Sequence, residues 1–128
     1  METVAEPLNI LAVIVGAVVA FLLGWLWYSP VLFGKKWAEG SGVELGTADE
    51  MPAFAMGAQM VALILLSLVV GLTATHNALF TAILAILAAA GFVVSGGAFV
   101  RKSAYAIRVD FGYILAAGIV MIICQGIF

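Results

Sequence analysis

The sequence contains very few charged residues. Asp, Glu, Lys and Arg make up 9% of its 128 residues, whereas about a quarter of the residues in a soluble domain are charged. Apolar residues make up 66% of the chain, and the mean hydropathy is +1.25. A chain of this length has too much surface to bury so much apolar area in one soluble core. The composition therefore excludes an ordinary soluble domain and predicts a protein that lies in lipid.

Cysteine and histidine are almost absent as well. The single Cys124 excludes an internal disulfide, and with His76 as the only histidine the chain cannot build a zinc site. Cys124 also lies one residue too far from the C-terminus for a prenylation motif. A haem with two axial histidines would need a second chain, so we interpret His76 as a hydrated turn residue.

Motifs that support catalysis are missing from the sequence. It has no nucleophile–base pair, phosphate-binding glycine loop, pair of catalytic carboxylates or group of metal ligands. We therefore expect a protein that is not an enzyme and that holds no metal or other cofactor. Its basic loops are too small for nucleic acid and suit anionic lipid headgroups instead. The lipid bilayer is thus the first partner that we expect.

Three long stretches of the chain carry no charge at all. They lie between Pro7 and Gly34, between Met51 and Val100, and after Asp110. A membrane span needs about 20 mostly apolar residues, each rising about 1.5 Å. The first and last stretches fit one helix each and the middle stretch fits two. We therefore predict an all-α membrane protein, a single domain of residues 1–128 whose four transmembrane helices cover about 8–28, 53–74, 77–100 and 111–128.

The N-terminal apolar stretch is expected to be the first of these helices. A secretory signal would have a basic n-region, a shorter apolar run and a small-residue cleavage site, and the sequence shows none of these features. Aromatic side chains gather at its far end, and Ser29-Pro30 should end the helix. A short interfacial segment, residues 31–37, is expected to follow. The predicted interfacial anchor comprises Trp25, Trp27, Tyr28, Pro30, Lys35, Lys36 and Trp37.

The connections between the other predicted helices are short. Only residues 75–77 separate the second helix from the third, which predicts an antiparallel hairpin with Asn77 as the N-cap of the third helix. The third helix is followed by a basic loop, residues 101–108. Asp110 is the predicted N-cap of the fourth helix, because its carboxylate can accept from free backbone N–H groups beside Arg108.

The positions of the basic residues predict the topology. All five lie in the first and third connections, and none lies in the N-terminal tail, the 75–77 turn or the C-terminus. Basic residues favour cytoplasmic loops. We therefore expect both termini to face the outside. The basic residues are Lys35, Lys36, Arg101, Lys102 and Arg108.

Small residues recur along two of the predicted helices. Ala12, Gly16, Ala20 and Gly24 follow one face of the first helix at intervals of four. Small residues let helix backbones approach closely in lipid, so this face should pack within the bundle or, alternatively, against a second chain. The small residues of the third helix, which support the same interpretation, are Gly91, Ser95, Gly96 and Gly97.

Few polar side chains lie within or beside the predicted spans. Gln59 and Ser95 should lie at nearly the same depth, so we expect a hydrogen bond between these two helices, with a substrate contact as the alternative. Asp110 is explained by helix capping, although acidic residues within a membrane usually mark ion pathways. Tyr113 follows it in the last helix.

Two stretches resemble a known family. Residues 27–37, Trp-Tyr-Ser-Pro-Val-Leu-Phe-Gly-Lys-Lys-Trp, resemble the WYSPLLFGKxW signature of a bacterial family called domain of unknown function 1761. Residues 110–113, Asp-Phe-Gly-Tyr, resemble that family's (D/N)-x-G-Y motif near its C-terminus. The four-helix layout matches too, so the resemblance covers essentially the whole chain. It implies a small protein of the bacterial inner membrane and supplies no activity.

Two functional hypotheses follow from these features. The first is a non-enzymatic scaffold or accessory subunit that works as an oligomer or within a larger membrane complex. Small-residue faces, scarce buried ionisable groups and short loops favour it. The alternative is a transporter or channel for ions or small solutes, whose pore forms only when copies of the chain assemble.

Overall fold

The computed structural model describes residues 7–43 and 53–128, and this part of the chain is helical with no strand. It contains α1 (Ile10–Trp27), α2 (Gly34–Ser41), α3 (Ala53–Ala74), α4 (Leu79–Phe99) and α5 (Ala104–Ile127). Four of these helices, α1, α3, α4 and α5, are long and apolar enough to cross a membrane. The prediction of an all-α protein with four candidate spans is therefore confirmed.

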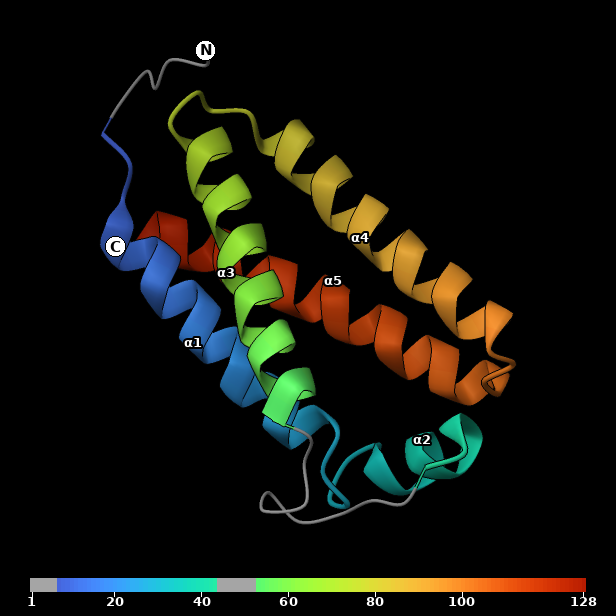
Figure 1. The fold of residues 1–128 in the computed structure, drawn as a ribbon. Coiled ribbons are helices and arrows are strands. Elements are labelled where there is room, and N and C mark those ends of the chain that lie inside the picture. Colours follow the sequence, from blue (N-terminus) through green and yellow to red (C-terminus); the bar gives the residue numbers. More distant parts are fainter. Residues whose placement is uncertain (1–6, 44–52) are drawn as a thin grey trace.

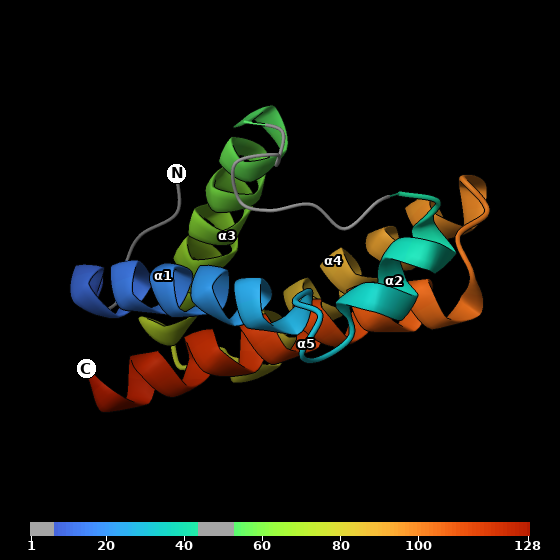
Figure 2. The same cartoon turned by 90° about the horizontal axis from the view of Figure 1, so that it is seen from below.

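Helix α5 is the centre of the fold. It contacts each of the other four helices, with its largest contacts to α1 and α4 (Figure 1). Figure 2 shows α3 rising out of the layer that α1, α4 and α5 form, with its N-terminal end farthest from that layer. The short α2 packs against α5 near the connection between α4 and α5. The C-terminal helix is thus the one on which the others assemble.

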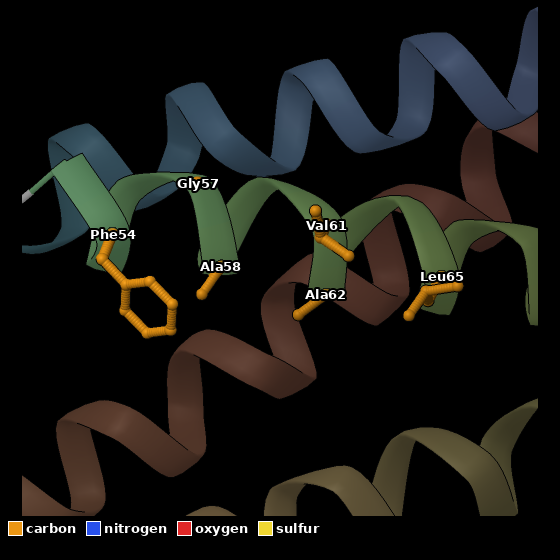
Figure 3. Close-up of a pocket in the computed structure, with 6 residues that line it drawn as sticks. All are labelled: Phe54, Gly57, Ala58, Val61, Ala62 and Leu65. Carbon is orange, nitrogen blue, oxygen red and sulfur yellow. The ribbon is translucent and has the colours of Figure 1, made fainter.

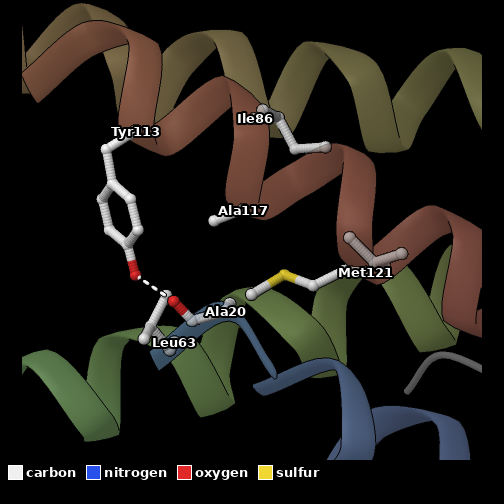
Figure 4. Close-up of a cluster of buried hydrophobic side chains, with 7 residues drawn as sticks. Ala20, Leu63, Ile86, Tyr113, Ala117 and Met121 are labelled. Carbon is white, nitrogen blue, oxygen red and sulfur yellow. Dashed lines mark hydrogen bonds between the residues drawn. The ribbon is translucent and has the colours of Figure 1, made fainter. Parts of the chain in front are cut away.

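The core forms where α1, α3 and α4 meet α5 (Figure 4). Small side chains allow these helices to approach closely, as expected for packing in lipid. A Cβ atom added at Gly118 of α5 would lie 2.5 Å from Ile86 Cδ1 of α4, so glycine is required at this crossing. The buried core residues are Ala20, Leu63, Val70, Ile86, Tyr113, Ala117 and Met121.

The outer helices leave much of their apolar surface uncovered. In the apolar windows of α3 and α4, 17% of the residues are buried, against 39% in α5. One face of α3 borders an open hollow of about 520 Å³ (Figure 3), whose lining side chains are all apolar or absent. Such a surface suits lipid or another helix rather than water. The lining residues are Phe54, Gly57, Ala58, Val61, Ala62 and Leu65.

The start of the last helix corrects one sequence-based prediction. Helix α5 begins at Ala104, and its N-cap is Ser103, whose Oγ accepts a hydrogen bond of 3.0 Å from the Ala106 N–H. Asp110 therefore lies inside the helix and is not its cap. The prediction was wrong because the serine hydroxyl, on an extended backbone, satisfies the free amides earlier in the chain.

The α3–α4 turn also differs from the prediction that Asn77 is the N-cap of α4. Ala78 occupies the N-cap position of α4 and makes no side-chain capping bond, so Asn77 is not the cap. Asn77 adopts a left-handed backbone, with φ of 53°, and its N–H donates to the Ala74 carbonyl at 3.2 Å. A capping residue normally has an extended backbone. Asn77 cannot be the cap because its left-handed backbone closes the tight turn.

Candidate functional site

The most specific polar arrangement in the described chain surrounds Asp110. This residue is 7% exposed and lies where the end of α1, helix α2 and the first turns of α5 meet. Its Oδ1 accepts hydrogen bonds from the Tyr28 hydroxyl at 2.6 Å and from Trp37 Nε1 at 2.8 Å. Its Oδ2 accepts one from Lys102 Nζ at 2.8 Å, which is also an ion pair. We call these four residues the Asp110 cluster.

A tight turn after α1 brings two of these residues to the carboxylate. The Gly34 N–H donates to the Ser29 carbonyl at 2.9 Å, and a Cβ at Gly34 would collide with the Tyr28 carbonyl oxygen. Only glycine therefore fits where the chain reverses into α2. The far end of α2 is fixed in turn, because the Ser103 N–H donates to the Gly40 carbonyl at 2.9 Å. Trp37 is held over α5 by both attachments.

Aromatic side chains enclose the carboxylate. The Tyr28 ring packs in T-shaped arrangements with the rings of Trp37 and Tyr113, with centroid distances of 4.9 and 5.6 Å. Trp27 Nε1 donates to the Val109 carbonyl at 3.0 Å, one residue before Asp110. These rings exclude water on the protein side, so the hydrogen bonds to Asp110 form in a region of low dielectric, where they are stronger.

A second hydrogen bond ties the same aromatic group to the middle of α1. The Tyr113 hydroxyl donates to the Ala20 carbonyl at 2.6 Å (Figure 4). The absence of a side chain at Gly24 makes room for it, since a Cβ there would lie 2.9 Å from the Tyr113 hydroxyl oxygen. Gly112 does the same for Trp27, whose Cζ2 would lie 3.2 Å from an added Cβ. The two motifs thus interlock at atomic contact.

Charge in the cluster is balanced locally. Lys102 neutralises Asp110, with 23% of the lysine side chain and 9% of the aspartate side chain exposed, and its Nζ lies 5.3 Å from the Trp37 ring centroid. Burial, together with the hydrogen bond to Asp110, raises the pKa of Tyr28 above its ordinary value. The Tyr28 hydroxyl therefore remains protonated and remains a donor to the carboxylate.

The other predicted site residues are distributed unevenly. Ala12, Gly16 and Ala20 are buried, and a Cβ at Gly16 would lie 3.1 Å from Ser67 Oγ and 3.5 Å from Met121 Cα, so this face of α1 contacts α3 and α5 of the same chain.

On α4, Gly97 is buried beside Ile107 of α5. By contrast, Gly91 and Gly96 are exposed, and a Cβ at either would meet no atom within 4 Å.

The expected hydrogen bond between Gln59 and Ser95 is not present among the described residues. Both are exposed, because α3 and α4 diverge away from their connecting turn (Figure 1). Gln59 instead lies beside the Tyr113 hydroxyl. Besides the Tyr113–Ala20 bond, a polar contact between spans is made by Ser67, whose Oγ donates to the Val13 carbonyl at 2.8 Å.

Sequence reasoning missed the roles of Lys102, Ser103 and Ser67. Lys102 is eight residues from Asp110, outside the three- or four-residue spacing that marks ion pairs along one helix. The anchor residues Tyr28 and Trp37 were found, but as an interfacial anchor and not as donors to Asp110. The sequence feature that connects Tyr28 and Trp37 with Asp110 is that both motifs belong to the same family resemblance. The described residues contain no group of three His, Cys, Asp or Glu side chains placed to hold a metal ion.

Comparison with known proteins gives one match. A family model described as "Protein of unknown function (DUF1761)" matches residues 11–126, which covers all but the outermost residue of α1 and of α5 and includes the motifs at residues 27–37 and 110–113. No curated protein and no solved structure matches the chain.

Proposed function

The chain belongs to the DUF1761 family of proteins of unknown function, and on that premise we propose that it is a non-enzymatic scaffold or accessory subunit. It acts as an oligomer or within a larger membrane complex, in the inner membrane of a bacterium. The family description carries no activity, so the proposal is based on the geometry of the Asp110 cluster and on the uncovered helix faces.

The hydrogen bonds and ion pair of Asp110 are the observation on which the proposal depends. Each of its carboxylate oxygens accepts a hydrogen bond from a side chain of the same chain, and Lys102 balances its charge. The contacts join the segment after the first span to the last helix. A carboxylate used in this way fixes tertiary structure, as buried polar groups do when all their partners are present.

The uncovered faces of α3 and α4 support a contact with another membrane helix. Phe54 and Phe92 are 88% and 80% exposed, while Gly57, Gly91 and Gly96 leave backbone accessible. Small residues beside large apolar ones are typical of helix contacts in lipid. The Asp110 cluster would hold the bundle rigid while these faces meet a partner.

We propose that α2 and the α4–α5 connection face the cytoplasm and that both termini face outside. The distribution of basic residues supports this orientation, since all five belong to these two connections or to the first turns of α5. In α2, Lys35 and Lys36 are exposed while Gly34 and Ala38 are buried, as in a helix lying along the membrane surface.

A transporter or channel remains the alternative, and one observation favours it. Asp110 is buried within a candidate span rather than at a helix end, and acidic residues in such positions usually mark ion pathways. Proton coupling would require the carboxylate itself, whereas a scaffold requires only its contacts.

Purification in a mild detergent followed by native mass spectrometry tests the scaffold proposal. A stable complex with another membrane protein, or a defined oligomer, is the expected result. Proteoliposomes containing the parent chain or Asp110→Asn provide the second measurement. A proton or ion flux that the parent supports and a folded Asp110→Asn variant lacks would overturn the scaffold proposal in favour of transport.

A further inference from the structure

The fold gathers the basic residues at one end of the molecule. Helix α2, which carries Lys35 and Lys36, packs against the start of α5, next to the connection that carries Arg101 and Lys102 (Figure 2). The contact is specific: Lys36 Nζ lies 5.0 Å from the Tyr105 ring centroid. Two segments that are far apart in the sequence therefore form one cationic surface.

Most of these basic side chains form no ion pair with a described carboxylate of the protein. In the part of the chain that the structure describes, the one ion pair is Lys102–Asp110. Lys35, Lys36, Arg101 and Arg108 are all exposed. Among the residues that the structure describes, Glu39 and Asp110 are the carboxylates at this end, against five basic side chains.

The Tyr105 ring lies beside Lys36 of α2 and is three residues from Arg108 on α5. Tyr105 and Arg108 are three residues apart on α5 and thus share one face of the helix. Lys36 reaches the same ring from α2. A guanidinium that can donate two parallel hydrogen bonds and an ammonium that acts as a point charge are the groups that bind a phosphate oxyanion.

Exposed apolar side chains next to the cations indicate where that phosphate comes from. Val31 and Leu32, 82% and 45% exposed, precede Lys35, while Phe99 and Val100, 87% and 70% exposed, precede Arg101. An apolar group followed by a cation is the order expected across the boundary between acyl chains and headgroups. A site for a soluble anion would not need these flanking apolar side chains.

We propose that Lys36, Tyr105 and Arg108 form a binding site for the phosphate of an anionic phospholipid. The headgroup phosphate lies between the Lys36 ammonium and the Arg108 guanidinium, beside the Tyr105 ring, and its acyl chains extend past the exposed apolar residues. This inference goes beyond the scaffold proposal and holds equally for a transporter, because it depends only on the surface where α2 meets α5.

Native mass spectrometry of delipidated protein in detergent tests the site by titration with phosphatidylglycerol and with phosphatidylcholine of the same acyl chains. The parent should bind phosphatidylglycerol more tightly. Removing a basic residue near an anionic headgroup should weaken binding about fivefold, so Lys36→Gln/Arg108→Gln should lose about 25-fold. The matched control is Lys35→Gln/Arg101→Gln, which removes equal charge from the same surface outside the site and should lose less than about fivefold.

Three results would overturn the site. These are equal affinity of the parent for the two lipids, equal losses in the two double variants, and displacement of phosphatidylglycerol by millimolar inorganic phosphate. The last would identify a site for soluble phosphate. The charge-preserving pair Lys36→Arg/Arg108→Lys, which should retain binding within about threefold, keeps the test valid if a neutral variant does not fold. A failed search for protein partners would leave this titration unaffected.

Discussion

The Tyr28 hydroxyl donates a 2.6 Å hydrogen bond to the carboxylate of Asp110, 82 residues later in the chain. Tyr28 immediately follows the first span, and Asp110 lies in the last, so the bond closes the bundle at one end. Trp37 of α2 and Lys102 of the connection before α5 donate hydrogen bonds to the same carboxylate. The two motifs by which the chain resembles its family therefore meet in one structural unit.

Removing the carboxylate should destabilise the protein strongly. Asp110→Ala leaves the Lys102 ammonium without a counter-charge and two partly buried donors without an acceptor, which should lower the free energy of unfolding by about 3–5 kcal/mol. Asp110→Asn keeps an acceptor and should lose about 1.5–3 kcal/mol. Unfolding by increasing SDS in mixed micelles measures both. Asp110→Ala/Lys102→Ala should regain part of the loss, and parent-like stability of Asp110→Ala would contradict a structural role.

Tyr28→Phe tests one hydrogen bond while preserving the ring. Loss of a donor to an ionised group should reduce stability by about 1.5–3 kcal/mol. Tyr105→Phe is the matched control, since Tyr105 contacts Lys36 outside the Asp110 cluster, and its stability should stay within about 0.5 kcal/mol of the parent. Equal melting temperatures for the two variants would argue against the Tyr28 contact.

The stabilisation from Tyr28 should also depend on pH. Folding raises the pKa of this hydroxyl above its ordinary value of 10.0, so the protonated form is favoured in the folded state. The contribution is therefore complete below pH 10 and is lost as the pH rises further. The stability difference between the parent and Tyr28→Phe should shrink above pH 10 in the same SDS titration. A difference that grows with pH would reverse this assignment.

Two glycines in neighbouring helices should respond oppositely to the same change. Gly118→Ala would place a methyl group 2.5 Å from Ile86 and should cost about 1–3 kcal/mol through forced separation of α4 and α5. Gly91→Ala meets no atom within 4 Å and should be neutral or slightly stabilising. Thermal unfolding in detergent measures both. A loss of stability in monomeric Gly91→Ala would contradict this prediction, because it would show that this face of α4 packs against another part of the chain.

Cysteine labelling in intact cells tests the proposed orientation. In a Cys124→Ala background, a cysteine at the exposed Val43 should resist an impermeant thiol reagent, because the proposed orientation places it on the cytoplasmic side. A cysteine at His76, exposed in the α3–α4 turn, should react. Permeabilised cells provide the control, since both positions should then be labelled. Labelling of Val43→Cys alone in intact cells would invert the topology.

Contact through the open face of α3 can be detected by crosslinking. Ala58→Cys in the same background should give dimers, or adducts with a partner, when membranes are treated with a short bifunctional thiol reagent. Val18→Cys, 45% exposed on α1, is the matched lipid-facing control and should remain monomeric. Equal crosslinking at the two positions would indicate random collisions and remove support for α3 as the interface.

The number and location of the candidate spans were determined by the sequence alone. Length and hydropathy are local properties of a run of residues, and a membrane helix satisfies its backbone hydrogen bonds within itself. The observed boundaries of α3, Ala53–Ala74, therefore match the prediction. The start of α5 does not, because two residues seven positions apart, Ser103 and Asp110, were both suitable caps and the earlier one is used.

Only the tertiary structure decided what Asp110 does. Its donors Trp37 and Tyr28 are 73 and 82 residues away, and no local pattern predicts which distant side chains will meet. Their meeting depends on the reversal at Gly34 and on the way α2 folds back onto α5. The polar contact of Ser67 with α1 is of the same kind. Spans follow from the solvent that each segment requires, whereas partners depend on how the helices pack against one another.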